Sequence, residues 1–98
     1  MVEKLPFCEI EVVPTHEMLQ KFYNYKRYEV TGKRYAHVST AVIAARVSTL
    51  ASAKHVIDEL RVNHKISPGA PITYRADNDV VPLMSDADWI MLILRESA

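Results

Sequence analysis

The stretch Thr49–Leu60, with the sequence TLASAKHVIDEL, belongs to the most regular apolar pattern of this 98-residue chain. Apolar residues recur there at spacings of three and four, which draws one stripe along a helix. They are Ile43, Val47, Leu50, Ala53, Ile57 and Leu60. We therefore predict a helix within Ala41–Val62, clearest over Thr49–Leu60. The segment Ala41–Val47 has the alternative of continuing a preceding strand, because it is rich in β-branched residues.

The sequence before this helix predicts three strands. Phe7–Val13 alternates between acidic and apolar residues, which is the period of a half-buried strand. Two segments rich in aromatic and β-branched residues, Tyr23–Val30 and Lys33–Thr40, follow it. They flank Thr31-Gly32, and a two-residue connection that contains glycine predicts a hairpin turn at that point.

A short helix is predicted between the first strand and the hairpin. Pro14 ends the strand, and Thr15 is a suitable N-cap for the helix. One face of this helix carries Leu19, Phe22 and Tyr23. Its end stays open, since Tyr23–Val30 is equally typical of a strand.

The sequence after the long helix predicts a second pair of strands. Ser67–Pro71 holds a glycine between two prolines and is therefore a loop. Ile72–Arg75 and Val80–Met84 then form two strands around a polar turn, Asp77-Asn78-Asp79. Pro82 indicates that the second of these strands lies at a sheet edge, or that the backbone nitrogen of this residue faces outward.

The last segment, Asp88–Ala98, is either a buried helix or a closing strand, because its apolar run is too short for periodicity to decide. Ser85 or Asp86 caps it. Trp89 is expected in the core as the anchor of this segment. Three methionines, Met18, Met84 and Met91, are also expected to fill the core.

These elements predict a single α+β domain over residues 1–98. The core order is ββαββ, with one helix on one face of a mixed sheet, which is the arrangement of a β-grasp (ubiquitin-like) roll. An additional N-terminal strand and a short helix precede that core.

Composition excludes several classes of protein. Twelve basic and twelve acidic residues give a formal net charge of zero, which argues against a generically basic nucleic-acid binder. The longest apolar run, Ile90–Leu94, is too short to span a membrane, and Met1–Cys8 lacks the apolar core of a signal peptide. Cys8 is the only cysteine, which favours a reducing compartment. We expect a natural start at Met1 and a cytoplasmic or nuclear protein that is not secreted and has no membrane partner.

No motif specifies a reaction. The histidines show no zinc-ligand spacing with one another or with the single cysteine. Two glycines leave little material for a phosphate-binding loop, and no serine lies in a Gly-x-Ser-x-Gly turn. We therefore expect no enzyme, no catalytic residues, no cofactor and no metal.

The charges are unevenly placed along the chain. Residues 20–37 hold five basic residues and one acidic residue, a balance of +4, whereas residues 77–98 hold five acidic residues and one basic residue, a balance of −4. The candidate acidic face consists of Asp77, Asp79, Asp86 and Asp88. The candidate basic face consists of Lys26, Arg27, Lys33 and Arg34.

If these two faces lie on opposite sides, the basic hairpin of one molecule can meet the acidic turn of the next in a head-to-tail contact. The alternative is that the charges are solvated surface residues or pair within one molecule. The sequence therefore predicts a non-catalytic module that binds another protein or itself.

The stretch Ile72–Trp89, ITYRADNDVVPLMSDADW, resembles the acidic signature of the Phox/Bem-type interaction domain, a ubiquitin-like β-grasp module. Tyr74 matches the strand tyrosine of that signature. The turn acids correspond to Asp77 and Asp79, and the second acidic group to Ser85, Asp86 and Asp88. The resemblance implies that this cluster binds a lysine on the first strand of a partner domain.

The same resemblance implies that Lys26 or Arg27 offers the basic position in this chain. The chain differs from the family at Ala76, which takes a place that is usually acidic, and in having too few residues after Trp89 for both a helix and a final strand. The additional strand Phe7–Val13 is a candidate to replace the missing one.

A second resemblance competes with the first. Tyr74–Asp77 and Asp88–Ile90 are similar to the end of enhancer-of-rudimentary proteins, which are small dimeric α+β scaffolds. Gly32, Tyr35 and Ala36 are similar to the second strand of those proteins. This resemblance implies a homodimer that rests on an apolar sheet face.

A third hypothesis comes from aromatic residues interleaved with basic residues. Aromatic rings that stack on bases, beside cations that hold phosphates, are what single-stranded RNA binding needs. The alternative is that the rings alternate between core and surface, as strand aromatics usually do. The aromatic residues are Phe22, Tyr23, Tyr25, Tyr28 and Tyr35, and the basic residues are Lys21, Lys26, Arg27, Lys33 and Arg34.

Overall fold

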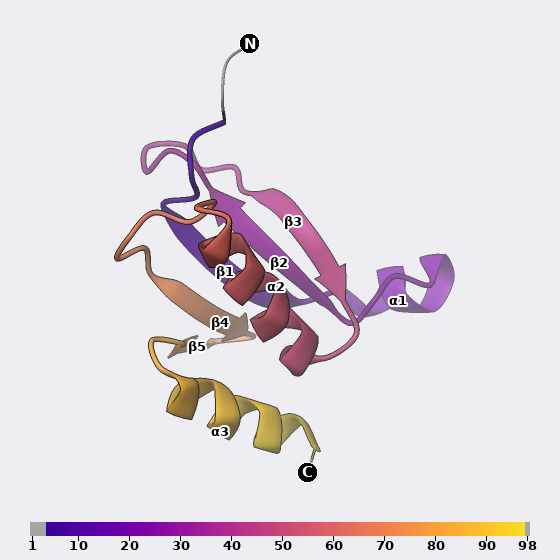
Figure 1. The fold of residues 1–98 in the computed structure, drawn as a ribbon. Helices are drawn as coiled ribbons and strands as arrows, with labels where there is room; N and C mark the ends of the chain where they lie inside the picture. The colour runs from indigo at the N-terminus through magenta and orange to yellow at the C-terminus, as the bar shows by residue number, and fades with distance from the viewer. Residues whose placement is uncertain (1–3, 98) are drawn as a thin grey trace.

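The computed structural model describes residues 4–97 and shows an α+β arrangement of one five-stranded mixed sheet and three helices (Figure 1). Met1–Glu3 and Ala98, which the predicted domain includes, lie outside the described residues. The strands are β1 (Glu9–Pro14), β2 (Tyr28–Lys33), β3 (Val42–Val47), β4 (Ile72–Ala76) and β5 (Asp79–Pro82). The helices are α1 (Glu17–Tyr23), α2 (Leu50–Val62) and α3 (Asp86–Ser97).

The N-terminal strand β1 lies at the centre of the sheet. The strand order is β3-β2-β1-β4-β5. β1 pairs antiparallel with β2, where Val12 faces Val30, and parallel with β4, where Ile10 faces Ile72. The antiparallel pairs β2–β3 and β4–β5 complete the two halves. A strand that the sequence predicts as an addition in front of the core therefore joins the two hairpins of that core.

The core lies between the sheet and α2, which covers one face of the sheet (Figure 1). Alternation along β1 points Ile10 and Val12 into this layer, where they are buried, as predicted. Ala53 and Ile57 of α2 meet them and are fully buried. Each fully buried aliphatic side chain of the size of valine or leucine contributes roughly 1.5–3 kcal/mol. Thus the apolar stripe of the long helix is what holds the helix to the sheet.

The boundaries of α2 settle the choice left open for the preceding segment. Thr49 caps the helix, because its hydroxyl oxygen accepts a hydrogen bond from the Ser52 amide. Val42–Val47 is strand β3 rather than helix. Its β-branched residues therefore follow strand propensity, and the predicted helix is correct over Thr49–Leu60.

The predicted hairpin turn at Thr31-Gly32 is wrong. β2 runs straight through both residues, and the connection to β3 comes later, over residues 34–41. Gly32 lies in the strand opposite Ile10 and Val42. A Cβ atom at Gly32 would come within 2.5 Å of Cδ1 of Phe7, so the glycine makes room for that ring. The glycine at this position therefore reflects close packing against Phe7 and not a turn.

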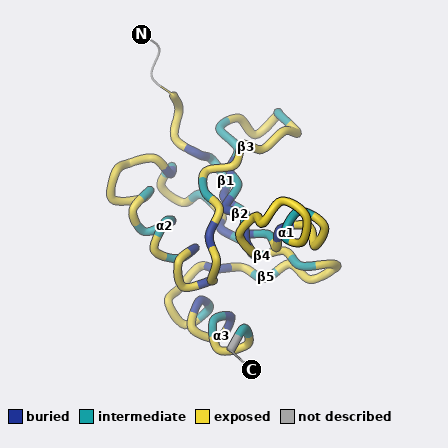
Figure 2. The backbone as a smooth tube through the Cα atoms, turned by 90° about the vertical axis from the view of Figure 1, so that its right-hand side faces the viewer, coloured by how far each residue is buried: buried dark blue, intermediate teal, exposed yellow. Residues whose placement is uncertain are grey.

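The short helix exists, but its cap and its packing differ from the prediction. The side chain of His16, not Thr15, accepts a hydrogen bond from the Met18 amide at 3.1 Å. Thr15 is buried, and its amide donates to the carbonyl of Arg27, so sheet-like contacts extend one residue past β1. No residue of α1 is buried, and Figure 2 shows the helix apart from α2, largely in yellow.

The last element is a helix, which settles the choice between helix and strand. The Ser85 hydroxyl accepts a hydrogen bond from the Asp88 amide, and the Asp88 carboxylate accepts hydrogen bonds from the amides of Ser85 and Met84. This reciprocal arrangement starts a helix, and Ser85 is the cap as predicted. Trp89 and Leu92 are buried beneath α3, which confirms the tryptophan as a core anchor.

The methionines predicted for the core are exposed instead. Met18, Met84 and Met91 expose 58%, 67% and 66% of their surface. Met18 belongs to the projecting helix α1, Met84 precedes α3, and Met91 lies on the outer side of α3. Leu83, Trp89 and Leu92 take the core positions of this region.

Replacement of Gly32 by alanine tests the packing of Phe7 against β2. We expect Gly32→Ala to lower the free energy of unfolding by about 1–3 kcal/mol, because the added methyl displaces the Phe7 ring. Urea denaturation measures the change. In a double-mutant cycle, Phe7→Leu should recover part of that loss in the Gly32→Ala background. Strictly additive effects would contradict a direct contact between the two positions.

Candidate functional site

The structure divides the candidate basic face between the two ends of β2. Lys26 and Arg27 precede the strand, whereas Lys33 ends it and Arg34 follows. A six-residue strand is roughly 17–20 Å long, so the two pairs cannot form one surface cluster. The structure therefore does not bring these four residues together.

The pair at the far end of β2 holds the N-terminal segment in place. Lys33 forms an ion pair with Glu9 at 3.2 Å, across the β1–β2 ladder. The Arg34 Nε donates a hydrogen bond to the carbonyl of Leu5 at 3.0 Å. The Arg34 guanidinium also lies 4.2 Å from the centre of the Phe7 ring, a cation–π contact. Both side chains thus have partners within the molecule.

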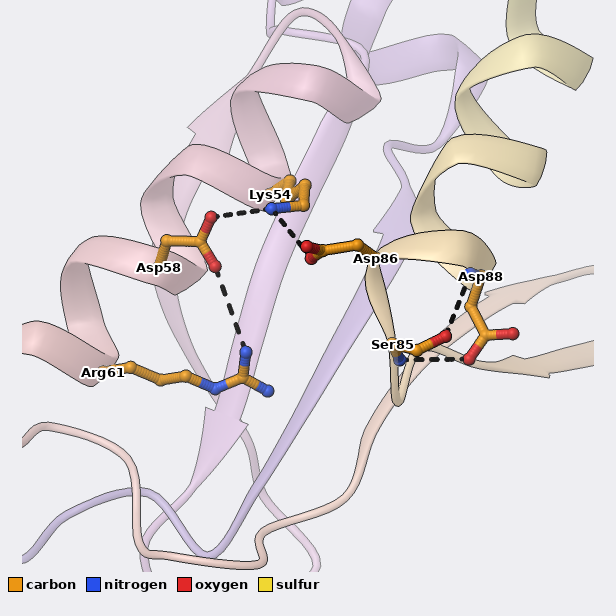
Figure 3. Close-up of polar contacts among 6 residues, drawn as sticks. All are labelled: Lys54, Asp58, Arg61, Ser85, Asp86 and Asp88. Carbon is orange, nitrogen blue, oxygen red and sulfur yellow. Dashed lines mark hydrogen bonds and ion pairs between the residues drawn. The ribbon is translucent and has the colours of Figure 1, made fainter.

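The candidate acidic face is divided in the same way, between the two ends of β5. Asp77 and Asp79 lie at the β4–β5 turn, whereas Asp86 and Asp88 lie in the first turn of α3. Asp86 forms an ion pair with Lys54 of α2 at 3.4 Å, and Lys54 also binds Asp58 at 2.9 Å (Figure 3). These contacts raise the pKa of Lys54, with the hydrogen bond to Asp58 as the main cause. Asp86 therefore links α3 to α2, while Asp88 caps α3.

The other four candidates lie at one end of the sheet, which we call the charged end and define as Lys26, Arg27, Asp77 and Asp79. The register places them there: Pro14 of β1 faces Tyr28, and Val12 faces Tyr74. The start of β2 and the end of β4 thus flank the same end of β1. Neighbouring strands lie about 4.8 Å apart, so Asp77 at the end of β4 lies roughly 10 Å from the start of β2, and Asp79 of β5 roughly 14 Å from it.

All four side chains of the charged end belong to exposed residues, and none of them has an ion pair with another described residue. Asp77 adopts a left-handed backbone conformation with φ of 54°, which suits aspartate or asparagine in a tight turn. A hollow of about 550 Å³ lies beside it, between this turn and the start of α1. The hollow is lined on the α1 side by His16 and Leu19.

The face of the sheet opposite α2 is charged. Ion pairs cross it between Glu29 and Arg46 at 3.1 Å and between Glu11 and Arg75 at 3.1 Å. Glu9, which pairs with Lys33, lies on the same face of β1 as Glu11. The bond to Glu11 raises the pKa of Arg75. Such a surface supplies little of the apolar area that a homodimer on the sheet face needs.

Three aromatic side chains of the α1 region are exposed, and two of them lie beside cations. Phe22, Tyr23 and Tyr25 expose 65%, 68% and 39% of their surface. Lys21 lies 5.7 Å from the centre of the Phe22 ring, and Arg46 lies 4.5 Å from that of Tyr25. Tyr28, by contrast, is buried in the core. The sequence pattern of aromatic and basic residues is therefore exposed over residues 21–27, whereas its last aromatic member, Tyr35, is exposed beyond the opposite end of β2.

The sequence patterns above do not predict the exposed apolar surface on α3. Four residues of α3 that point away from the core are exposed and apolar. A signal for them was available, because five consecutive apolar residues on a helix must point to all of its sides. These outward residues are Ala87, Ile90, Met91 and Leu94.

The described residues contain no group of three or more His, Cys, Asp or Glu side chains placed to hold a metal ion. Among the helices of residues 4–97, none has the length and apolar character that crossing a membrane requires.

Tyr28 gives the fold a dependence on alkaline pH. Burial, and next the neighbouring Glu96 carboxylate, raise the pKa of Tyr28. The unfolded chain releases this proton at the ordinary tyrosine pKa of about 10, whereas the folded chain retains it. The free energy of unfolding should therefore hold below pH 10 and fall above it, by at most about 1.4 kcal/mol per pH unit from this group.

Urea denaturation between about pH 9 and pH 11.5 measures this fall. Tyr28→Phe should make the fall shallower, while Tyr35→Phe, at an exposed tyrosine, is the matched control. Equal slopes in the native chain and in Tyr28→Phe would contradict the prediction.

A comparison with protein-family models finds no match to this chain, and comparisons with curated proteins and with solved structures find none either.

Proposed function

We propose that this chain is a non-catalytic protein–protein interaction module that assembles through the charged end, with a second copy or with another protein of matching charge. One observation carries the proposal. Of the eight charged residues that the sequence singles out, four have an ion pair or a side-chain hydrogen bond, and the four that have neither among the described residues lie together at one end of the sheet.

The arrangement of signs at the charged end favours a two-fold contact. Its basic and acidic members lie side by side, so a partner must present the same two signs in reverse order. A second copy does this when it is turned by 180°, since the acidic turn of each copy then meets the basic segment of the other. A head-to-tail chain, by contrast, needs the two signs on opposite sides of the molecule. Contacts of this kind set orientation and association rate more than affinity.

The proposed fold type is a β-grasp roll of the Phox/Bem kind. The ββαββ part of the chain, with α2 over one face of the sheet, supports it. β1 supplies the fifth strand from the N-terminal side, which makes up for the short segment after Trp89. Asp86 binds Lys54 of α2 and Asp88 caps α3, so we propose Asp77 and Asp79 as the acids that meet a partner.

Removal of either sign from the charged end should prevent this assembly. We expect the native chain to gain mass in light scattering at about 20 mM salt and to lose it near 0.5 M, where charges are screened beyond a few ångströms. Asp77→Asn/Asp79→Asn and Lys26→Gln/Arg27→Gln should each abolish that salt-dependent gain. Asparagine suits the left-handed conformation at position 77, so the turn is kept.

The control is Asp58→Asn/Glu59→Gln on α2, which changes the net charge by the same amount as the acidic pair and should leave assembly intact. A further arm uses charge reversal. Asp77→Lys/Asp79→Lys and Lys26→Glu/Arg27→Glu should each remain unassembled alone, because each presents one sign only. If the native chain and all variants show the same mass at every salt concentration, assembly through the charged end is refuted.

Binding of single-stranded RNA is a second candidate function, and the exposed aromatic residues of the α1 region favour it. Phe22 and Tyr23 face solvent, and Lys21 lies 5.7 Å from the centre of the Phe22 ring, which is the pairing of ring and cation that base stacking and phosphate binding use. In this alternative, Lys26 and Arg27 hold the RNA backbone rather than a partner's acids.

Fluorescence anisotropy with a labelled uridine oligonucleotide tests the RNA alternative. Phe22→Ala/Tyr23→Ala should weaken binding about tenfold or more, since each stacked base contributes about 1–3 kcal/mol. Tyr35→Ala, at an exposed aromatic of the β2–β3 connection, is the control. No increase in anisotropy at about 20 mM salt would exclude this function, whereas it would leave the protein-binding proposal unaffected.

A further inference from the structure

Helix α3 is apolar on two opposite sides. Its inner side buries Trp89 and Leu92, which are 3% and 4% exposed. Its outer side presents Ile90, Met91 and Leu94, which are 55%, 66% and 64% exposed. Figure 1 shows α3 at the lower border of the molecule, with α2 above it and no element beyond it. A surface helix with one covered side normally turns charged residues outward, so this outer side is atypical.

The outer residues form a continuous stripe. Ala87, Ile90, Met91 and Leu94 follow one another at spacings of three, one and three, which is the pattern of a helix that packs against another helix. The charged residues of α3 lie only at its two ends. Asp86 and Asp88 belong to the first turn, and Arg95 and Glu96 to the last turn, where the half-buried Glu96 carboxylate accepts a hydrogen bond from the Leu50 amide of α2.

We propose that a second copy of this chain docks on this stripe, so that the two α3 helices pack antiparallel about a two-fold axis between residues 90 and 91. The proposal concerns a different surface from the charged end and does not depend on it. Three features of the stripe point to a copy of the chain itself as the occupant.

The first feature is a register in which every stripe residue meets an apolar residue. With the axis between residues 90 and 91, Ile90 of one copy lies level with Met91 of the other. Ala87 then lies level with Leu94, which sets a small side chain against a large one at both ends of the contact. A two-fold contact requires such self-complementarity, because each residue pair occurs twice.

The second feature is charge. Antiparallel packing brings the acidic first turn of one α3 beside Arg95 in the last turn of the other, at both ends of the contact. Parallel packing would place acids beside acids and arginine beside arginine. The Asp86 side chain is 86% exposed despite its ion pair with Lys54, so it remains open to a second cation. The antiparallel order also opposes the two helix dipoles favourably.

The third feature is size. The twelve residues of α3 extend about 18 Å, so a single helix pair buries an area near the lower limit for specific contacts. We therefore expect a reversible dimer with a dissociation constant in the micromolar range or weaker, seen at high protein concentration. Because the contact is mainly apolar, it should persist at a salt concentration that abolishes contacts of the charged end.

Sedimentation equilibrium at about 0.5 M salt tests for the dimer, since charged contacts are then screened. We expect a reversible monomer–dimer equilibrium for the native chain. Met91→Lys/Leu94→Lys should be monomeric at all concentrations, whereas Val62→Lys, at an exposed valine on α2, should retain the dimer. Thermal melting followed by circular dichroism verifies that the variants fold.

Disulfide formation tests the register, in a Cys8→Ser background that removes the native thiol. A mixture of the Ala87→Cys and Leu94→Cys chains should cross-link into a heterodimer, because these positions lie level across the axis. Neither chain alone should cross-link, since its two cysteines are seven residues apart along the helix axis, or about 10 Å. A native chain that stays monomeric at high salt, or cross-linking of either chain with itself in place of the mixture, overturns the proposal.

The two assembly proposals fail separately in these experiments. Asp77→Asn/Asp79→Asn should keep the dimer at high salt and the cross-link while it loses the salt-dependent assembly. Met91→Lys/Leu94→Lys should do the opposite.

Discussion

The central position of β1 is the constraint on which the other elements depend. β1 is hydrogen-bonded on both of its edges, to β2 and to β4, and its inward residues Ile10 and Val12 are buried under α2. Without it, the β2–β3 hairpin and the β4–β5 hairpin would be two separate ribbons, and isolated two-stranded ribbons are marginal in water. The close approach of Phe7 to Gly32 extends the contact between this segment and β2 to residues that precede β1.

Periodicity was sufficient for most elements of the fold. Ile57 and its neighbours define α2, the alternation around Ile10 defines β1, and Pro82 lies on an edge strand as its missing N–H requires. The turn predicted at Gly32 is wrong, because the sequence does not distinguish a glycine that makes room for a neighbouring ring from a glycine that forms a turn. The burial predicted for Met91 is wrong, because a hydrophobic residue is buried only where another element covers it. Whether an element covers Met91, and whether the Phe7 ring packs on Gly32, both depend on residues that are distant in the sequence.

The candidate site shows which part of a charge pattern sequence can resolve. The imbalance between the two halves of the chain is visible in the sequence, but the role of each charge depends on its neighbours in space. Lys33 and Asp86 have acidic or basic partners on other elements, whereas Arg27 and Asp77 project from the ends of neighbouring ladders. Strand register decided this division, and register follows from long-range pairing that no local pattern contains.

The parallel pairing of β1 with β4 also orders the events of synthesis. Ile10 leaves the ribosome early, yet its partner Ile72 follows only after β2, β3 and α2 have been made. During that interval one edge of the central strand has no ladder to join, and the loop that must close spans most of the chain. A nascent chain of this protein therefore carries an exposed, pairing-competent strand edge until its final third emerges, which is the interval in which a chaperone has most to protect.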